Sequence, residues 1–252
     1  MQYTYIALIL ALIAFTYEAS YPVIGKSTYK KLKNVKELSG LALSEDASFL
    51  WGVGDEGDFV KISTDGDNKV TKITNFDDDT EGITINRDTG DLIVSLEPNK
   101  VGIIKKSGGF KKLQILFKIQ EAAKFGNAGL EGITYYKDGY VYVGSQNGPY
   151  LWKCDLKGKC GTKQKLKNVV KELTEVAGLC YDHERDRLWI IDSNKRRLYL
   201  LSGDAKKLLT KYELGKIGNP ESVSVDHKHG VVWVGDDSSS TSKLYKFKFS
   251  NL

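Results

Sequence analysis

Short apolar runs separated by polar turns fill most of the chain, and one layout of such runs recurs five times. Each repeat starts at a small residue, continues as a short apolar strand, passes through a polar turn and enters a second, more apolar strand. The small residues that mark the repeats lie 42 to 50 positions apart: Gly40, Gly82, Gly132, Gly178 and Ser222. A period in the forties with several strands per unit is typical of a β-propeller blade. The pattern therefore predicts an all-β fold, a five-bladed β-propeller.

The strands within a repeat differ in their hydrophobic pattern. Second strands such as 188–191 (LWII) and 231–234 (VVWV) are apolar on both faces, as expected when a sheet is packed between two neighbouring sheets. Later strands such as 244–249 (LYKFKF) alternate lysine with apolar residues, which predicts outer strands with one solvated face. These lysines, like those of 105–112 (KKSGGFKK), are better explained by a solvated edge than by a nucleic-acid surface. We therefore expect no nucleic-acid partner.

The ends of the chain predict how the ring closes. Only three strands fit after Ser222, the last ending at Phe249, whereas residues 27–35 (STYKKLKNV) form a strand-like segment before the first repeat. We predict that this N-terminal segment supplies the outermost strand of the last blade, which closes the ring. Helix is expected only at 118–125 and 168–173, as short insertions between blades.

The N-terminus begins with an apolar run at residues 6–15 (IALILALIAF). This run is too short to span a bilayer and matches the core of a signal peptide. We interpret residues 1–20 as a signal peptide cut near Ala19 or Ser20, followed by one domain over 21–252. A retained interfacial anchor is the alternative. The expectation is a secreted, extracellular protein without stable membrane insertion.

Two of the three cysteines predict a disulfide. Cys154 and Cys160 flank a turn-like segment between two strands, so their sulfurs can face one another across a hairpin. A bond that closes so short a loop would stabilise the fold by about 2–3 kcal/mol. Cys180 stands in an apolar run and is predicted to be a buried free thiol.

Composition limits the remaining choices. Lys+Arg 37 against Asp+Glu 32 gives a net charge of +5, and 41% of the residues are hydrophobic. These values exclude a disordered tail and a strongly charged nucleic-acid clamp, and they provide for a full-sized core. The chain also lacks GxSxG, HExxH, a phosphate loop and a dinucleotide fingerprint, the usual markers of nucleophile, zinc and nucleotide chemistry.

Acidic residues recur at two positions of the repeat. In a propeller the innermost strand begins, and the second strand ends, at the same rim of the central channel, so both positions converge on one mouth. The start position supplies Glu81, Glu131 and Glu221, with Ser39 and Ala177 in the other two repeats, where Glu37 and Glu175 stand two residues earlier. The ends of the second strands supply Asp55, Glu56, Glu97, Gln146, Asn147, Asp192, Asp236 and Asp237. One mouth should therefore be acidic although the chain is basic.

Converging carboxylates need protons or a cation. Two carboxylates about 4 Å apart repel by about 4 kcal/mol at an effective dielectric near 20. Ca²⁺ accepts about six to eight oxygen ligands, whereas zinc and copper favour His and Cys, which do not converge here. Glu81, Glu131 and Glu221 are the candidate calcium ligands. The acidic run 77–79 could add others, although a solvated loop explains it better. The alternative, that the glutamates accept hydrogen bonds from backbone N–H groups at the strand ends, stays open.

Two functions fit such a mouth. The first is a ligand- or protein-binding module, expected to be a monomer, whose small-molecule or protein ligand is unknown. Tyr135, Tyr136, Tyr150 and Trp152 are candidate aromatic contacts, although burial between blades explains them better. The alternative is a calcium-dependent hydrolase of an ester, lactone or phosphoester, with Glu97 or Asp192 as general base.

Several segments resemble those of a known family. The most specific are 127–133 (NAGLEGI) and 220–222 (PES), accompanied by ELSGL, TEGI and VAGL at the other repeats. Over roughly residues 33–249 the chain resembles the SdiA-regulated family of β-propellers and, more distantly, the esterase-like phytase propellers. The first resemblance implies an extracytoplasmic propeller with a bound calcium. Neither resemblance implies a catalytic residue.

Overall fold

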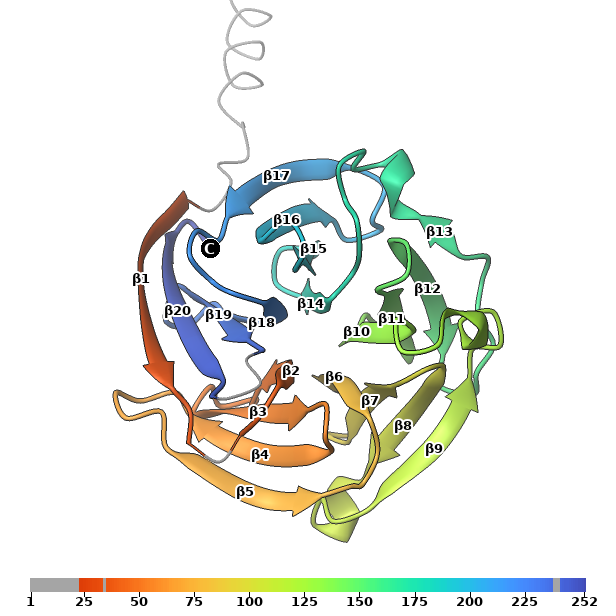
Figure 1. The fold of residues 1–252 in the computed structure, drawn as a ribbon, viewed down its shortest axis with the longest axis horizontal. Helices are drawn as coiled ribbons and strands as arrows, with labels where there is room; N and C mark the ends of the chain where they lie inside the picture. The colour runs from red at the N-terminus through yellow and green to blue at the C-terminus, as the bar shows by residue number, and fades with distance from the viewer. Residues whose placement is uncertain (1–22, 34, 238–240) are drawn as a thin grey trace, which may run out of the picture.

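The structure, a computed structural model, describes residues 23–33, 35–237 and 241–252. The predicted signal peptide and its cleavage site lie outside these residues. Five four-stranded antiparallel sheets surround a central axis (Figure 1), which confirms the five-bladed propeller. None of the helices in the described part of the chain is long and apolar enough to cross a membrane.

Four blades run outward from the axis in chain order, and the fifth takes its outermost strand from the N-terminus. The blades are β2(Leu38–Leu43), β3(Phe49–Gly54), β4(Asp58–Ser63) and β5(Val70–Asn75); β6(Thr80–Ile85), β7(Leu92–Leu96), β8(Lys100–Ile104) and β9(Leu113–Lys118); β10(Leu130–Tyr135), β11(Tyr140–Ser145), β12(Tyr150–Asp155) and β13(Gln164–Lys165); β14(Gly178–Asp182), β15(Arg187–Asp192), β16(Arg197–Ser202) and β17(Leu208–Glu213); and β18(Pro220–Asp226), β19(Val231–Asp236), β20(Lys243–Ser250) and β1(Val23–Lys31). The helices among the described residues are the 3-10 turns η1(Lys106–Gly108), η2(Ala123–Phe125) and η3(Leu166–Asn168), so the two predicted helical insertions are shorter than expected.

The ring closes as predicted. β1 pairs antiparallel with β20, with Tyr29 opposite Tyr245 and Lys31 opposite Lys243. The strand nevertheless lies at Val23–Lys31 rather than at 27–35. Leu32 and Val35, which gave the sequence its strand-like pattern, are buried in the core beyond the end of the strand. The apolar pattern therefore predicted the right segment, but the predicted strand runs past the observed end at Lys31.

The core lies between neighbouring blades. The second strands β7, β15 and β19 are buried along their whole length, which confirms the prediction from their continuous apolar runs. Trp189 on β15 packs with Val232 and Val234 on β19, and its ring meets the edge of Phe249 at 5.7 Å. Each sheet is thus covered on both faces by its neighbours.

The small residues that mark the repeats are needed where the innermost strands meet. A Cβ at Gly178 would lie 2.3 Å from the carbonyl oxygen of Glu221, and one at Gly82 would lie 2.6 Å from that of Glu131. One position later, a buried apolar ring encircles the axis: Leu41, Ile83, Ile133, Leu179 and Val223. The space within this ring is about 10 Å³, no more than one water molecule needs. The ring divides the channel into two separate mouths.

Hydroxyl groups join the innermost strands of adjacent blades. Thr84 Oγ1 accepts a hydrogen bond from the backbone N–H of Tyr135 (2.9 Å), and Thr134 Oγ1 accepts one from that of Tyr181 (2.8 Å). Ser224 Oγ accepts one from the N–H of Leu43 (2.9 Å). Cys180 holds the same place in its blade; it is half-buried, and burial raises the pKa of its thiol to about 12. The three hydroxyls satisfy N–H groups on the free edges of β10, β14 and β2.

We expect Thr134→Val to lower the free energy of unfolding by about 1–2 kcal/mol, because it leaves the buried N–H of Tyr181 without its acceptor. Urea unfolding would measure the loss. Thr71→Val, at an exposed position of β5, is the matched control and should change stability by less than about 0.5 kcal/mol. Equal stability of Thr134→Val and the wild type would contradict a stabilising role for these bonds.

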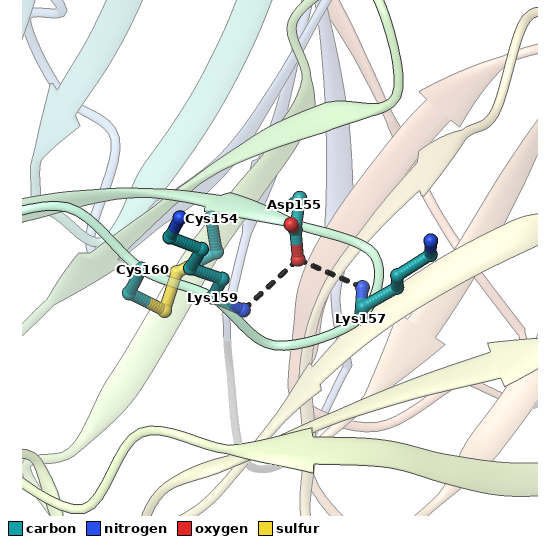
Figure 2. The surroundings of a disulfide bond; sticks show 5 residues. All are labelled: Cys154, Asp155, Lys157, Lys159 and Cys160. Atoms are coloured by element: carbon teal, nitrogen blue, oxygen red, sulfur yellow. Dashed lines mark hydrogen bonds between the residues drawn. A yellow bond between two sulfur atoms is a disulfide. The ribbon is translucent and has the colours of Figure 1, made fainter.

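The predicted disulfide is present. Cys154 ends the apolar part of β12 and bonds to Cys160 across a tight turn, with the two Cα atoms 4.0 Å apart. Figure 2 shows Asp155 inside this turn, where its carboxylate accepts hydrogen bonds from the backbone N–H groups of Lys157 and Lys159, both at 2.9 Å. The disulfide therefore fastens a turn that Asp155 already orders.

Replacing Cys154 and Cys160 together by alanine should lower the free energy of unfolding by about 2 kcal/mol, since the closed loop is short. Urea unfolding under oxidising conditions measures this change. Wild-type protein treated with a reductant should lose a similar amount, and the double variant should then lose nothing further. A reductant effect that persists in the double variant would contradict the prediction.

Candidate metal and ligand site

The acidic residues that the repeat predicts do gather at one end of the channel. We call this end the acidic mouth and define it by Asp55, Asp79, Glu81, Glu97, Glu131, Glu175, Glu221 and Asp237. Glu81, Glu131 and Glu221 lie near the start of β6, β10 and β18, the strands around the axis in Figure 1. Asp55, Glu97 and Asp237 lie in the loops that follow the second strands β3, β7 and β19.

Local irregularities in pairing aim these glutamates at the axis. The register of β6 with β7 shifts between Thr80 and Gly82, so Glu81 is the extra residue of a β-bulge. The same shift occurs around Glu131 in β10 and around Glu221 in β18. A bulge redirects its extra side chain away from the regular alternation of the strand. The repeated bulge is therefore the local cause of the acidic cluster.

Two groups of carboxylates are close enough to share one ion. Oxygens of Glu81, Glu97 and Glu131 all lie within 4.8 Å of one another, and these three residues are buried. Asp55, Asp79 and Glu81 form a second group under the same limit, so Glu81 belongs to both. Glu97 Oε1 accepts a hydrogen bond from the backbone N–H of Gly129 at 3.1 Å. Oδ1 of Asp79 is buried, and no donor of the described residues reaches it.

Nothing on the described part of the chain neutralises the centre of this cluster. The ion pairs of this mouth join Lys100 to Asp78 (3.3 Å) and Lys243 to Asp236 (3.1 Å). No ion pair among the described residues involves Glu81, Glu97, Glu131 or Glu221. The charge of these carboxylates must therefore be reduced by protons or balanced by a cation.

The electrostatic consequence is a set of raised pKa values. Burial, and then repulsion from Glu131, raises the pKa of Glu81 well above its ordinary value. Burial and the charge of Glu221 do the same to the pKa of Glu131. Burial, followed by Asp55, raises the pKa of Asp79 to about 7, and burial raises that of Asp237 to about 6. The metal-free mouth therefore holds protons at a pH where free carboxyl groups have lost them.

Two of the predicted site residues have local partners instead. Asp192 accepts hydrogen bonds from the N–H and hydroxyl of Thr174, both at 2.7 Å, and from the N–H of Lys195 at 3.0 Å. Asp236 accepts the N–H of Asn219 at 2.8 Å and pairs with Lys243. Both side chains therefore hold the loops around the mouth.

The other predicted positions vary in exposure. Glu56 and Asn147 are exposed at the rim, and Gln146 is half-buried. Glu175 accepts the backbone N–H and the side-chain amide of Asn194, both at 2.7 Å. The alternative interpretation expected glutamates that accept hydrogen bonds from backbone N–H groups, and Glu175 makes such a contact. Its blade, however, has Ala177 and no glutamate at the start position.

The aromatic candidates lie elsewhere. Tyr135, Tyr136 and Trp152 are buried between blades, as the preferred interpretation expected. Tyr150 is half-buried and stacks on Phe125, with ring centroids 6.0 Å apart. We therefore assign none of them to the acidic mouth.

Sequence reasoning missed two residues of the mouth. It favoured a solvated loop for the run 77–79, yet Asp79 lies against Asp55 and Glu81. It also passed over Asn219, whose Nδ2 donates to Glu221 Oε1 (2.7 Å) and to Asp237 Oδ2 (2.9 Å). The signal for Asn219 was its place just before the PES segment, where an amide can bridge the two acidic positions of one blade.

Comparison with known families agrees with this architecture. The family model described as "Phytase-like: Esterase-like activity of phytase" matches residues 33–179, more than half of the chain. The chain belongs to this phytase-like family. The matched region contains Asp79, Glu81, Glu97 and Glu131, and so includes both carboxylate groups. Membership of the SdiA-regulated family in particular stays a prediction, and no curated protein matches the chain.

Solved structures similar to this member of the phytase-like family share its fold. The luciferin-regenerating enzyme is 15% identical with a TM-score of 0.56, over 88% of this chain and 95% of that one. Virginiamycin B lyase from Staphylococcus aureus is 12% identical with a TM-score of 0.53, over 88% and 99%. A protein of unknown function from Bacteroides thetaiotaomicron is 12% identical with a TM-score of 0.58, over 89% and 73%. At such low identity these likenesses show the fold alone.

Proposed function

We propose that the acidic mouth binds Ca²⁺ and that the protein is a ligand-binding module that uses this mouth. The observation that carries the proposal is the buried group of Glu81, Glu97 and Glu131, whose oxygens lie within 4.8 Å of one another. No cationic side chain in the described part of the chain pairs with them. All ligand atoms of this group are carboxylate oxygens, the donor type that Ca²⁺ prefers. The buried, unpartnered Oδ1 of Asp79 adds a further oxygen beside Glu81.

Bound Ca²⁺ would change what the mouth can recognise. Without a cation the mouth repels anions, whereas a Ca²⁺ held by Glu81, Glu97 and Glu131 can accept an oxygen atom from a ligand. The exposed rim residues Glu56 and Asn147 would then meet the rest of that ligand. The ligand class we propose is a small molecule or peptide that offers a carboxylate, phosphate or carbonyl oxygen.

A calcium-dependent hydrolase is the second candidate, and the family match favours it because the family's description names an esterase-like activity. Ca²⁺ would supply Lewis-acid polarisation of an ester, lactone or phosphoester. Glu97 suits the role of general base: Gly129 fixes one of its oxygens, and burial raises the pKa of its carboxyl above the ordinary value. Asp192 suits it less, because both of its oxygens already accept hydrogen bonds.

Thermal melting tests the metal first. A site saturated about 100-fold above its Kd stabilises the fold by about 2.7 kcal/mol, which raises the Tm by about 5–10 °C. We expect this increase in Ca²⁺ but a smaller one in equal Mg²⁺, since Mg²⁺ demands a stricter geometry. A Tm that is identical in Ca²⁺ and in chelator would overturn the metal proposal.

Hydrolysis assays then separate the two functions. Activated carboxylic esters, lactones and phosphodiesters would be offered in Ca²⁺ and in chelator. Calcium-dependent turnover that is lost in Glu97→Gln but kept in Glu121→Gln, an exposed glutamate on the outside of the ring, would establish the hydrolase. Calcium binding without turnover of any class would favour the binding module.

We also propose that the protein acts outside the cell as a monomer, without a nucleic-acid partner. The disulfide supports an oxidising compartment, and the N-terminal apolar run supports export. N-terminal sequencing of protein expressed with its leader tests the export. A mature chain that begins near residue 20 is expected, and a retained leader would contradict the proposal.

A further inference from the structure

A second cavity lies at the opposite end of the channel. It encloses about 620 Å³, within the range of small-molecule sites, and is lined by the ends of the innermost strands and the turns that follow them. His183 and His227 line it, and His229 stands in the same turn as His227, so all three histidines of the sequence lie at this end. We call this cavity the histidine mouth. The apolar ring separates it from the acidic mouth.

The wall of the histidine mouth is partly apolar. Leu43, Ile85 and Val225 line it and are only half-buried. They occupy the same position in three different blades, three residues after the marker. An apolar surface that faces a cavity from three sides loses contact with water when a ligand fills that cavity.

The buried carboxylates of the histidine mouth already have partners. Asp182 accepts from His227 Nε2 at 2.7 Å and from the backbone N–H of Glu184 at 3.0 Å. Asp226 accepts the N–H of His229 at 3.1 Å and pairs with its Nδ1 at 2.8 Å.

The remaining acidic groups of this mouth are at its rim. Asp46 is held by the hydroxyls of Ser44 and Ser48, Glu184 lies 3.7 Å from His227 Nδ1, and Glu45 is exposed to solvent. Water screens the charge of these three groups, whereas the buried Asp182 and Asp226 are each hydrogen-bonded to a histidine.

Two cations of the lining have no such partner. Neither Arg87 nor Lys228 forms an ion pair with any described residue, and both are exposed at the cavity. His183 stands nearby between two rings, 6.2 Å from that of Tyr135 and 4.7 Å from that of Tyr181. Burial, followed by the charge of Arg87, lowers the pKa of His183 to about 4, so its imidazole is neutral and offers a hydrogen bond without charge.

We propose that the histidine mouth is a second ligand site, which binds a small amphipathic anion. The carboxylate or phosphate group of this anion meets Arg87 and Lys228, and its apolar part lies against Leu43, Ile85 and Val225. The site is independent of the calcium proposal, because the apolar ring closes the channel between the two mouths.

NMR of the histidine imidazoles tests this directly, since all three report on this end of the molecule. Octanoate and octyl phosphate are the probes, and octyltrimethylammonium carries the opposite charge on the same apolar chain. We expect saturable shifts of His183 and His227 with at least one of the two anions and none with the cation. The tighter of the two anions then identifies the headgroup.

Variants locate the contact. Arg87→Gln and Lys228→Gln should each weaken anion binding about tenfold, and Lys207→Gln, an exposed lysine of an outer turn, should leave it unchanged. Because Arg87 and Lys228 are exposed, neither change should unfold the protein. The absence of a saturable shift up to about 10 mM of either anion, equal binding of the cation, or anion binding unaffected in both variants would overturn the proposal.

Discussion

Glu131→Gln is expected to raise the Tm of the calcium-free protein at about pH 8 by about 6–12 °C, which corresponds to about 3 kcal/mol. Glu131 is buried against Glu81, Glu97 and Glu221, and its pKa is raised well above the ordinary value. At this pH, ionisation of the glutamate lowers the free energy of the unfolded chain more than that of the folded chain. The difference destabilises the fold. Glutamine keeps the shape of the protonated side chain and removes that difference. Differential scanning calorimetry in chelator measures it.

The same variant should lose the response to Ca²⁺. Glutamine removes one negative charge and one strong oxygen ligand from the group, so Ca²⁺ should no longer raise the Tm. Glu121→Gln is the matched control, because its exposed ion pair with Lys163 contributes little, and it should resemble the wild type in both measurements. At about pH 4, below the ordinary pKa of a glutamate, the unfolded chain keeps most of its protonation, and the gain in Glu131→Gln should largely disappear. A Glu131→Gln protein that is less stable than the wild type in chelator at both pH values would contradict this account.

The second large effect is the pH dependence of the calcium-free fold, whose free energy of unfolding should fall by at least about 3 kcal/mol between about pH 5 and about pH 8. In the folded state the pKa of Asp79 is raised to about 7 and that of Asp237 to about 6, from 3.8 in both cases. Between the unfolded and folded values the folded chain binds protons that the unfolded chain has released. Stability therefore falls as the pH rises through this window and levels off above the folded pKa values. Urea unfolding in chelator at a series of pH values measures the slope.

Two comparisons show whether the acidic mouth causes that slope. Saturating Ca²⁺ should flatten it, because the metal replaces the protons, and Asp79→Asn should reduce it. The pair of His227 with Asp182 raises the pKa of that histidine, so it also gives stability at low pH that is lost as the pH rises. Ca²⁺ should leave this smaller part unchanged. Stability that rises from pH 5 to pH 8 in chelator would contradict the prediction.

The ring architecture could be predicted because one steric requirement repeats. Where innermost strands meet, a side chain at Gly82 or Gly178 would collide with the backbone of the next blade, so a small residue marks each repeat. Residues that occupy the same position of the repeat lie at the same level along the propeller axis. Glu81, Glu131 and Glu221 could therefore be assigned to one mouth. Neighbouring blades cover each second strand, and this produced the continuous apolar runs.

The partners of individual carboxylates could not be predicted in the same way. Asp192 and Asp236 stand at the predicted height, but each turns to the N–H groups of a neighbouring loop. Asp79 joins the cluster because the loop before β6 folds over the mouth, and an acidic run in the sequence does not show that. The β-bulge that aims Glu81 inward depends on the pairing of two strands, which the residue pattern of one strand does not record.

The histidine mouth was also absent from the sequence-based picture. Its three histidines occur in polar turns, which indicate solvated loops. The cavity forms only when the turns of different blades are brought around one axis. Residues of several blades line this cavity together. The repeat pattern shows only the features that single blades share, so it could not predict the cavity.

Calorimetric titration of the mature protein with Ca²⁺ tests most directly whether the converging carboxylates form a metal site. The account predicts saturable binding with one Ca²⁺ per chain in the wild type and in Glu121→Gln, and no measurable binding when Glu81 and Glu131 are both replaced by glutamine. A wild-type protein that shows no saturable binding would contradict it, as would a double variant that binds Ca²⁺ as tightly as the wild type.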